Sequence, residues 1–204
     1  MSTLTSPYRG SGQLTREQFL FYEMRTTAQL LQETEDYKEV TDRIVNENLF
    51  QYPTEKSVRD MVRTCLRRLE ALDDPDLVRT IAAGTGDEAR QICLYAMMRK
   101  HRLVWDFMIT VIGAKYRQQD FTFSRREVLG YIMLLQEQDS YVAEWSEGTI
   151  KKIVSVLISI LVQNEYIDNP RANRLNPVLI SRTLENSIRS NGQELALVAF
   201  NCLD

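Results

Sequence analysis

A row of positive charge is the feature of this sequence whose residue types and spacing could do chemistry. Four cations recur at intervals of three and four residues between Thr54 and Leu72, namely Lys56, Arg59, Arg63 and Arg67. On a helix, which turns about 100° per residue, these side chains fall within roughly a quarter-turn of one another. Such a row can neutralise nucleic-acid phosphates. A solvated helix face has the same pattern, so the row alone leaves both interpretations open.

The segments around this row predict how it is positioned. Apolar residues with the same spacing form the opposite face: Val58, Met61, Val62, Cys65, Leu66, Leu69 and Leu72. Before it, Thr15-x-x-Gln18 predicts a capping box that opens a helix to about Leu31, and a second helix follows at 36–48. A connector ending at Pro53 precedes a helix capped by Thr54. This is the order of a helix-turn-helix unit, although the connector is longer than in the simplest examples.

The start of this helix is repeated 92 residues later. Residues 54–62, TEKSVRDMV, align with residues 146–154, SEGTIKKIV. Both begin with a hydroxyl cap followed by an acid, which suits the start of a helix. We therefore predict two helix-turn-helix-like units. The second helix is more apolar, so only its first turns could contact DNA, through Thr149, Lys151 and Lys152.

Two further basic clusters are candidate contacts. Arg99, Lys100 and Arg102 lie between two apolar helices, where they could contact phosphates or simply end a helix, since cations stabilise a helix C-terminus. Arg125 and Arg126 fall in the first turn of a helix opened by Ser124-x-x-Glu127, where the helix dipole disfavours cations. That placement favours an anionic partner.

The remaining pattern predicts an all-α fold, a compact multi-helix globule. Helices are expected at about 75–83, 87–98, 103–115, 124–135, 139–144, 146–163 and 176–190, and residues 194–200 close the chain. Residues 166–174 predict either a short hairpin like the wing of a winged helix or a plain loop. The expected organisation is a loose segment 1–14, an N-terminal helix-turn-helix-like unit 15–83, a central apolar helical hairpin 84–120, and a helix-turn-helix or winged-helix-like unit 121–204.

Composition excludes several classes of function. The net charge of −3 argues against a uniformly basic nucleic-acid binder but permits a local patch. Cys65, Cys93 and Cys202 lack metal-ligand spacing, and Cys65 and Cys93 fall on apolar faces. His101, the only histidine, is expected at the surface. No catalytic motif, cofactor loop or metal site is recognisable, which predicts a non-enzymatic protein. The apolar run 153–162 is about half the length that spans a bilayer, so no membrane association is expected. A cytoplasmic protein fits best.

The succession of motifs resembles the BrxA family of the BREX phage-exclusion systems. The resemblance rests on LFQYPTEKSVRDMVRTCLRRLEAL, GDEARQICLYAMMRKHRLVWDFM, AEWSEGTIKKIVSVLISILVQNEYI and LNPVLISRTL, and covers nearly the whole chain from about Leu14 to Cys202. It implies a mostly helical cytoplasmic protein that binds double-stranded DNA. Its partners would be a methyltransferase, a phosphatase-like component and ATPases. No contact residue is carried over from the family.

Two alternatives to DNA binding remain open. The acidic segment 17–48, with eight acids against three bases, and the basic faces could dock other components of the system, which would make the protein an interaction scaffold. A compact helical bundle could also bind RNA, because the candidate face lacks Asn or Gln side chains that read adenine.

Overall fold

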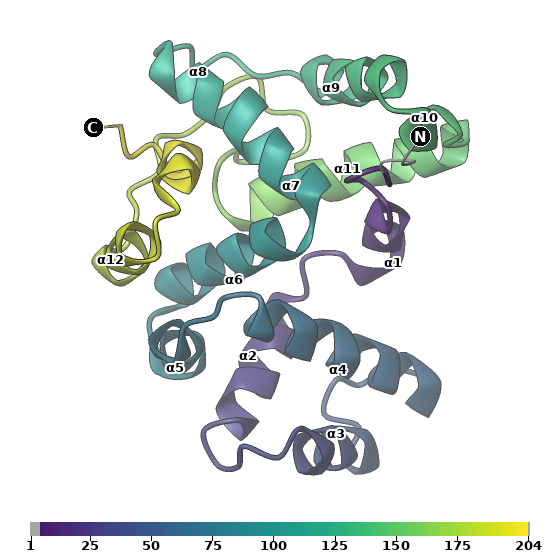
Figure 1. Cartoon of the computed structure of the whole chain (residues 1–204), viewed down its shortest axis with the longest axis vertical. Coiled ribbons are helices and arrows are strands. Elements are labelled where there is room, and N and C mark those ends of the chain that lie inside the picture. Colours follow the sequence, from purple (N-terminus) through teal and green to yellow (C-terminus); the bar gives the residue numbers. More distant parts are fainter. Residues whose placement is uncertain (1–4, 204) are drawn as a thin grey trace. The chain divides into compact units, whose positions relative to one another are not determined.

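The computed structural model describes residues 5–203, and its regular elements are helices (Figure 1). The predicted all-α fold is confirmed. The chain divides into two compact units. Unit 1 contains the N-terminal residues up to Gln18, then 101–180 and the residues from Ile188 onward, whereas unit 2 contains 19–100 and 181–187. Each is described by itself.

Unit 2 is built from consecutive helices around a buried centre. They are α2 (Phe21–Leu30), α3 (Tyr37–Asn46), α4 (Glu55–Glu70), α5 (Pro75–Ala83) and α6 (Gly86–Lys100). The helix α4 packs against α2, α3 and α6 (Figure 1). Every residue of α6 from Ile92 to Met98 is buried, so this helix forms the core of the unit. Cys65 and Cys93 are buried as small core residues, as expected.

Unit 1 joins segments that are distant in the sequence. They are α1 (Leu14–Glu17), α7 (Arg102–Phe107), a π-helical turn (Met108–Gly113), α8 (Ala114–Arg117), α9 (Arg125–Gln138), α10 (Ser140–Ala143), α11 (Glu147–Gln163) and a 3₁₀ helix (Glu194–Phe200). The helix α9 packs against α10 and α11, and the π-helical turn packs against the 3₁₀ helix. A further helix, α12 (Arg182–Ser190), has residues in both units.

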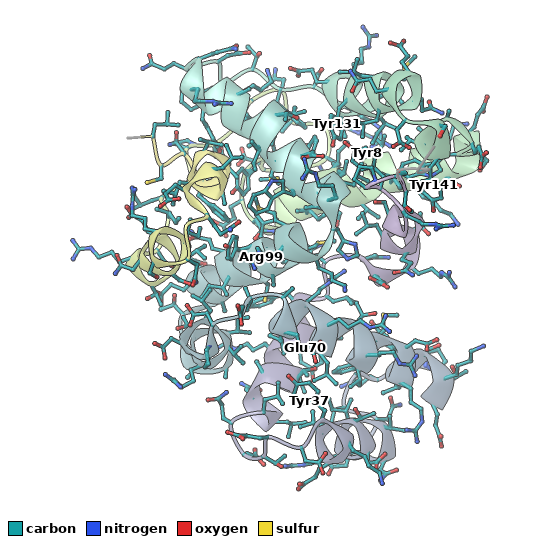
Figure 2. All side chains as sticks on the ribbon, in the orientation of Figure 1. Tyr8, Tyr37, Glu70, Arg99, Tyr131 and Tyr141 are labelled. Atoms are coloured by element: carbon teal, nitrogen blue, oxygen red, sulfur yellow. The ribbon has the colours of Figure 1, made fainter. Side chains whose placement is uncertain are left out.

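The described part of the N-terminal segment is attached to unit 1. The Ser6 hydroxyl donates to Asp139 over 3.0 Å, and the Tyr8 hydroxyl donates to Asp106 over 2.9 Å. Burial and the neighbouring Asp106 carboxylate raise the pKa of Tyr8 to about 12, so this hydroxyl stays protonated at neutral pH. Figure 2 shows Tyr8 near Tyr131, whose hydroxyl donates to the Leu103 carbonyl. Residues 1–4 of the segment predicted to be loose lie outside the described residues.

The first predicted helix is broken. The expectation of one helix from Thr15 to Leu31 is wrong, because Gln18 and Leu20 adopt left-handed backbone conformations with φ of 36° and 59°. These values end α1 and start α2 in a new direction, with the buried Phe19 between them. The predicted Thr15 cap is also wrong: Thr15 lies inside α1, and its hydroxyl donates to the Gly12 carbonyl.

The predicted helix at 176–190 starts later than expected. Residues 176–181 have no helical structure, and α12 begins at Arg182. Asn176 is held in an extended segment because its backbone N–H donates to Tyr166 and its side chain donates to the Glu165 carbonyl. Of the two expectations for 166–174, the loop is what forms. Arg174 makes an isolated antiparallel bridge with Thr122 instead of pairing within a hairpin.

Gly113 allows the close packing of the π-helical turn on the 3₁₀ helix. A Cβ at this position would lie 2.5 Å from Val198 Cγ2 and 3.1 Å from the Val198 carbonyl carbon. Gly113→Ala should therefore lower the free energy of unfolding by about 2 kcal/mol through overpacking. Gly148→Ala is the control, since its Cβ would meet only the Ser146 hydroxyl at 3.8 Å. Urea unfolding followed by circular dichroism measures both, and equal stabilities would contradict the packing argument.

Candidate nucleic-acid interface

The predicted basic row lies on the exposed face of α4. Lys56, Arg59, Arg63 and Arg67 are all exposed, whereas Val58, Val62, Cys65 and Leu69 on the other side are buried. Thr54 caps the helix by accepting a hydrogen bond from the Ser57 backbone N–H over 3.2 Å. The amphipathic pattern thus orients the cations toward solvent, as the sequence predicts.

Two of these four cations have acidic neighbours. Arg59 lies 3.6 Å from the Asp42 carboxylate on α3, and Arg63 lies 3.0 Å from Asp60 on α4 itself. Within the described residues, Lys56 and Arg67 form no ion pair. Exposed ion pairs contribute little, about 0–1 kcal/mol, so a phosphate can replace these carboxylates at small cost. The charge of the row is nevertheless partly offset by α3, which the spacing within α4 could not reveal.

The repeated sequence has the same local structure in both units. Ser146 caps α11 as Thr54 caps α4: its hydroxyl accepts from the Thr149 N–H over 3.2 Å. In each motif the two hydroxyl oxygens are also close, at 2.9 Å for Thr54–Ser57 and 3.0 Å for Ser146–Thr149. The Thr149 hydroxyl is therefore already engaged and half-buried, which makes it a weaker candidate contact than the exposed Lys151 and Lys152.

Arg125 joins the lysines of α11, although it is distant in sequence. Its guanidinium donates to the Ser155 hydroxyl over 3.1 Å, and that hydroxyl donates to the Lys151 carbonyl over 2.8 Å. Ser155 lies one helical turn after Lys151 and Lys152, so Arg125 extends their row across the α9–α11 contact. We call these four residues, Arg125, Lys151, Lys152 and Ser155, the α11 basic surface. Lys151 lies 3.5 Å from the exposed Glu147, the acid of the repeated motif.

The acid nearest to Arg125 in sequence is directed into unit 1. Glu127 contacts the buried Lys115 ammonium over 2.6 Å, and the Ser124 hydroxyl donates to the same carboxylate. Lys115 also contacts Asp120 over 2.8 Å, and this hydrogen bond is the largest of the effects that lower the pKa of Asp120. The first turn of α9 therefore exposes its two arginines, while its carboxylate, although partly exposed, is paired with the buried Lys115.

The cluster Arg99, Lys100 and Arg102 is divided between the units, which meet in sequence at Lys100–His101. Arg99 is half-buried, with its guanidinium carbon 6.0 Å from the centre of the Tyr95 ring (Figure 2 labels Arg99). Arg102 is held by Asp106 over 2.8 Å. Lys100 is exposed and forms no ion pair with the described residues. Arg99 and Arg102 therefore have structural partners, and this cluster is a weaker candidate than α4 or the α11 basic surface.

The surface position expected for His101 is wrong. The side chain is 7% exposed, and its Nε2 lies 3.5 Å from the Glu17 carboxylate of α1. His101 precedes α7 and adopts an extended backbone, which turns its ring into unit 1. Its sequence setting between two arginines and a lysine concealed this, because the flanking charges are exposed while the histidine is not.

Unit 2 also has an acidic hollow, a cavity of about 590 Å³ lined by the segment that follows α2, the start of α3, the end of α4 and the start of α5. Its lining includes four acids, Glu35, Glu70, Asp73 and Asp74. Figure 2 shows Tyr37 beside Glu70, and burial followed by the Glu70 charge raises the pKa of that tyrosine. A surface of this sign repels phosphates, so it does not belong to a nucleic-acid interface.

Residues 5–203 contain no group of three His, Cys, Asp or Glu side chains that could hold a metal ion. None of their helices combines the length and apolar character needed to cross a bilayer.

Known proteins provide an independent comparison. The family model of BrxA matches residues 7–192. A protein of Bacillus cereus (strain H3081.97), named BREX protein BrxA, is 32% identical over 155 residues, which cover 76% of this chain and 77% of that protein. A protein of the same name from Escherichia coli O9:H4 (strain HS) is 24% identical over 172 residues, 84% of this chain and 80% of that one.

A solved structure supports the fold. The crystal structure of an uncharacterized protein from Magnetospirillum magneticum superposes with a TM-score of 0.77 and 23% sequence identity. The match covers 94% of this chain and 98% of that one. The helical arrangement is therefore one that a natural protein adopts.

Proposed function

The chain belongs to the BrxA family, and we propose that it is a DNA-binding protein of a BREX anti-phage defence system. It would bind double-stranded DNA through exposed helix faces, mainly by contacts to phosphates. This proposal unites the family membership with the two basic helix faces. The other components of the system, including its methyltransferase, phosphatase-like protein and ATPases, would be its protein partners.

One observation carries the proposal: the capped motif that occurs twice exposes its cations both times. Lys56 and Arg59 in the first copy and Lys151 and Lys152 in the second are exposed, while Val58 and Val62 of the first and Ile153 and Val154 of the second are buried. We propose that α3, the connector and α4 act as a helix-turn-helix in unit 2, and that α9, α10 and α11 do so in unit 1; the order of these elements supports this. Each motif would place its helix against the phosphate backbone.

The mode of binding follows from the side chains available. The α4 row offers only Lys and Arg, and the α11 basic surface adds a serine hydroxyl already bonded to Lys151. These groups bind phosphates well, and the row has no Asn or Gln side chain that could read adenine. We therefore propose a non-enzymatic cytoplasmic protein with weak sequence preference.

The proposal predicts strong salt dependence. If the four cations of α4 each neutralise one phosphate, the slope of log K against log salt should be about −3.6, a loss of roughly a hundredfold between about 50 and 200 mM salt. Fluorescence anisotropy with a labelled duplex measures this slope. Structured RNA added as competitor is the comparison: displacement at lower concentration than unlabelled duplex would favour RNA binding. An affinity that hardly changes with salt would contradict phosphate-driven binding altogether.

A scaffold function is the second candidate, and the acidic hollow of unit 2 favours it. Its four acids and Tyr37 could receive a basic segment of another BREX component. The ion pair between Arg59 and Asp42 also shows that the basic row can pair with protein carboxylates. Reversing the charges of Arg59 and Arg63 in α4 separates the two functions.

A further inference from the structure

The outward face of α9 is apolar although it is exposed. Leu129, Met133 and Leu134 are 40%, 54% and 49% exposed, and they lie on the side of the helix that faces away from α10 and α11. Val128, Ile132 and Leu135 already supply the buried face. Grouped exposed apolar side chains of this kind mark an interaction surface more often than singly scattered ones.

Gly130 lies in the middle of this face, and no contact or backbone conformation of the described residues requires a glycine there. A Cβ added there would have no atom within 4 Å, and its backbone φ is not left-handed. Glycine in a helix interior costs about 1 kcal/mol relative to alanine. Neither packing nor backbone conformation within this chain offsets that cost. A small residue at the centre of an apolar helix face does allow a second helix to approach closely.

The exposed face has a self-complementary order. From its start to its end it reads Arg126, Leu129, Gly130, Met133, Leu134 and Glu137, all exposed. If this helix is laid antiparallel on a copy of itself about the midpoint between 131 and 132, a cation stands level with an acid, a glycine with a large side chain, and a leucine with a leucine. Arg126 is then level with Glu137 of the copy, Gly130 with Met133, and Leu129 with Leu134.

Helix geometry also places the two charged residues, Arg126 and Glu137, on the same face of α9. At about 100° per residue, Arg126 and Glu137 differ by roughly 20° around α9, so both point along the centre of the same face. Gly130 and Met133 flank that line by similar angles on either side. In the antiparallel pair, Met133 would extend over the space left by Gly130 of the copy, and two Arg126–Glu137 ion pairs would close the ends.

We propose that α9 is a self-association surface, through which two copies of this chain form an antiparallel, two-fold symmetric pair. An isologous contact requires a surface complementary to itself, which this face provides. Within residues 5–203, Arg126 and Glu137 form no ion pair, so their charges are available. The proposal is independent of DNA binding, and it assigns Arg126 to self-association while leaving Arg125 on the α11 basic surface.

One helix face buries less area than a typical obligate interface, so the dimer should be weak and concentration-dependent. Sedimentation velocity of the full chain, from low micromolar to several hundred micromolar protein, should show a shift from monomer to dimer. Met133→Asp should abolish this shift, because it buries an unpaired carboxylate at the centre of the contact. Circular dichroism checks that this exposed substitution leaves the fold intact.

Charge exchange tests the antiparallel arrangement itself. Arg126→Glu or Glu137→Arg should each weaken the dimer by about tenfold or more, since each places like charges together twice per dimer. The double variant, Arg126→Glu with Glu137→Arg, restores opposite charges and should return the dissociation constant to near the original value. Glu194→Arg, an exposed change outside α9, is the control and should have no effect.

Three results would overturn the proposal. The unaltered chain could stay monomeric at every concentration, which would assign the α9 face to another partner or to none. Dimerisation could persist in Met133→Asp, which would place the contact elsewhere. The double variant could remain as weak as the single ones, which would exclude pairing of Arg126 with Glu137.

Discussion

Reversing two charges of α4, with Arg59→Glu and Arg63→Glu together, should lower the affinity for duplex DNA by about a hundredfold at low salt. Two phosphate contacts would be lost, and two carboxylates would repel the backbone. The existing acids increase the effect, since Asp42 and Asp60 would no longer be neutralised. Electrophoretic mobility shift and anisotropy titrations measure the change.

A matched control distinguishes the effect of the α4 charges on DNA affinity from the effect of the net charge of the protein. Lys38→Glu with Arg79→Glu changes the net charge by the same amount, in the same unit, at exposed positions that are not part of the α4 row. This variant should bind DNA nearly as well as the unaltered chain. Equal losses in both variants would show that only net charge matters, which would contradict a defined α4 interface.

The α4 variant, Arg59→Glu with Arg63→Glu, also distinguishes DNA binding from the scaffold function. Lost DNA binding with intact assembly of the BREX components supports the first, and lost assembly with intact DNA binding supports the second. Lys151→Glu with Lys152→Glu makes the corresponding test of unit 1. If it weakens binding more than the α4 variant does, the α11 basic surface is the principal contact.

Local sequence patterns predicted the helices well because their causes are local. Thr54 and Ser146 cap helices as expected, and the spacing of apolar residues places the buried face of α4 correctly. The break between α1 and α2 could not be predicted in this way. Neither Gln18 nor Leu20 favours a left-handed backbone, so tertiary packing around Phe19 decides their conformation.

The candidate interface was predictable in its composition but not in its neighbours. The cations of α4 and α11 were identified from spacing, and all of them are exposed, whereas the candidates Arg99 and Thr149 are half-buried. The contact of Arg125 with Ser155 links residues 30 positions apart, and the contact of Arg59 with Asp42 links two helices. Both depend on how helices pack, which no spacing within one helix encodes.

Arg68 is a single residue whose contact also depends on helix packing and could not be predicted from spacing within α4. Helical spacing alone predicts that Arg68 lies near the boundary of the apolar face of α4, where its charge could reach solvent along the core edge. In the structure its side chain is 0% exposed, and its guanidinium donates to the Phe19 carbonyl over 2.9 Å. Phe19 precedes the left-handed Leu20 at the start of α2, so Arg68 supports the segment where the first predicted helix is broken.

Truncation of this residue, Arg68→Ala, should lower the free energy of unfolding by about 3 kcal/mol. It leaves the buried Phe19 carbonyl without this donor and opens a cavity where a large side chain was packed. Arg68→Met should cost less, because it keeps most of the packing volume while losing the hydrogen bond. Urea unfolding followed by circular dichroism gives the three stabilities.

Arg67→Ala is the control for this experiment, because Arg67 is the adjacent residue of the same helix but is exposed. Its loss should change stability by less than about 0.5 kcal/mol while still weakening DNA binding. The two neighbours thus have opposite expected effects: Arg68 supports the fold, and Arg67 contacts the ligand. Equal unfolding free energies for the two alanine variants would show that the buried guanidinium does not stabilise the start of α2.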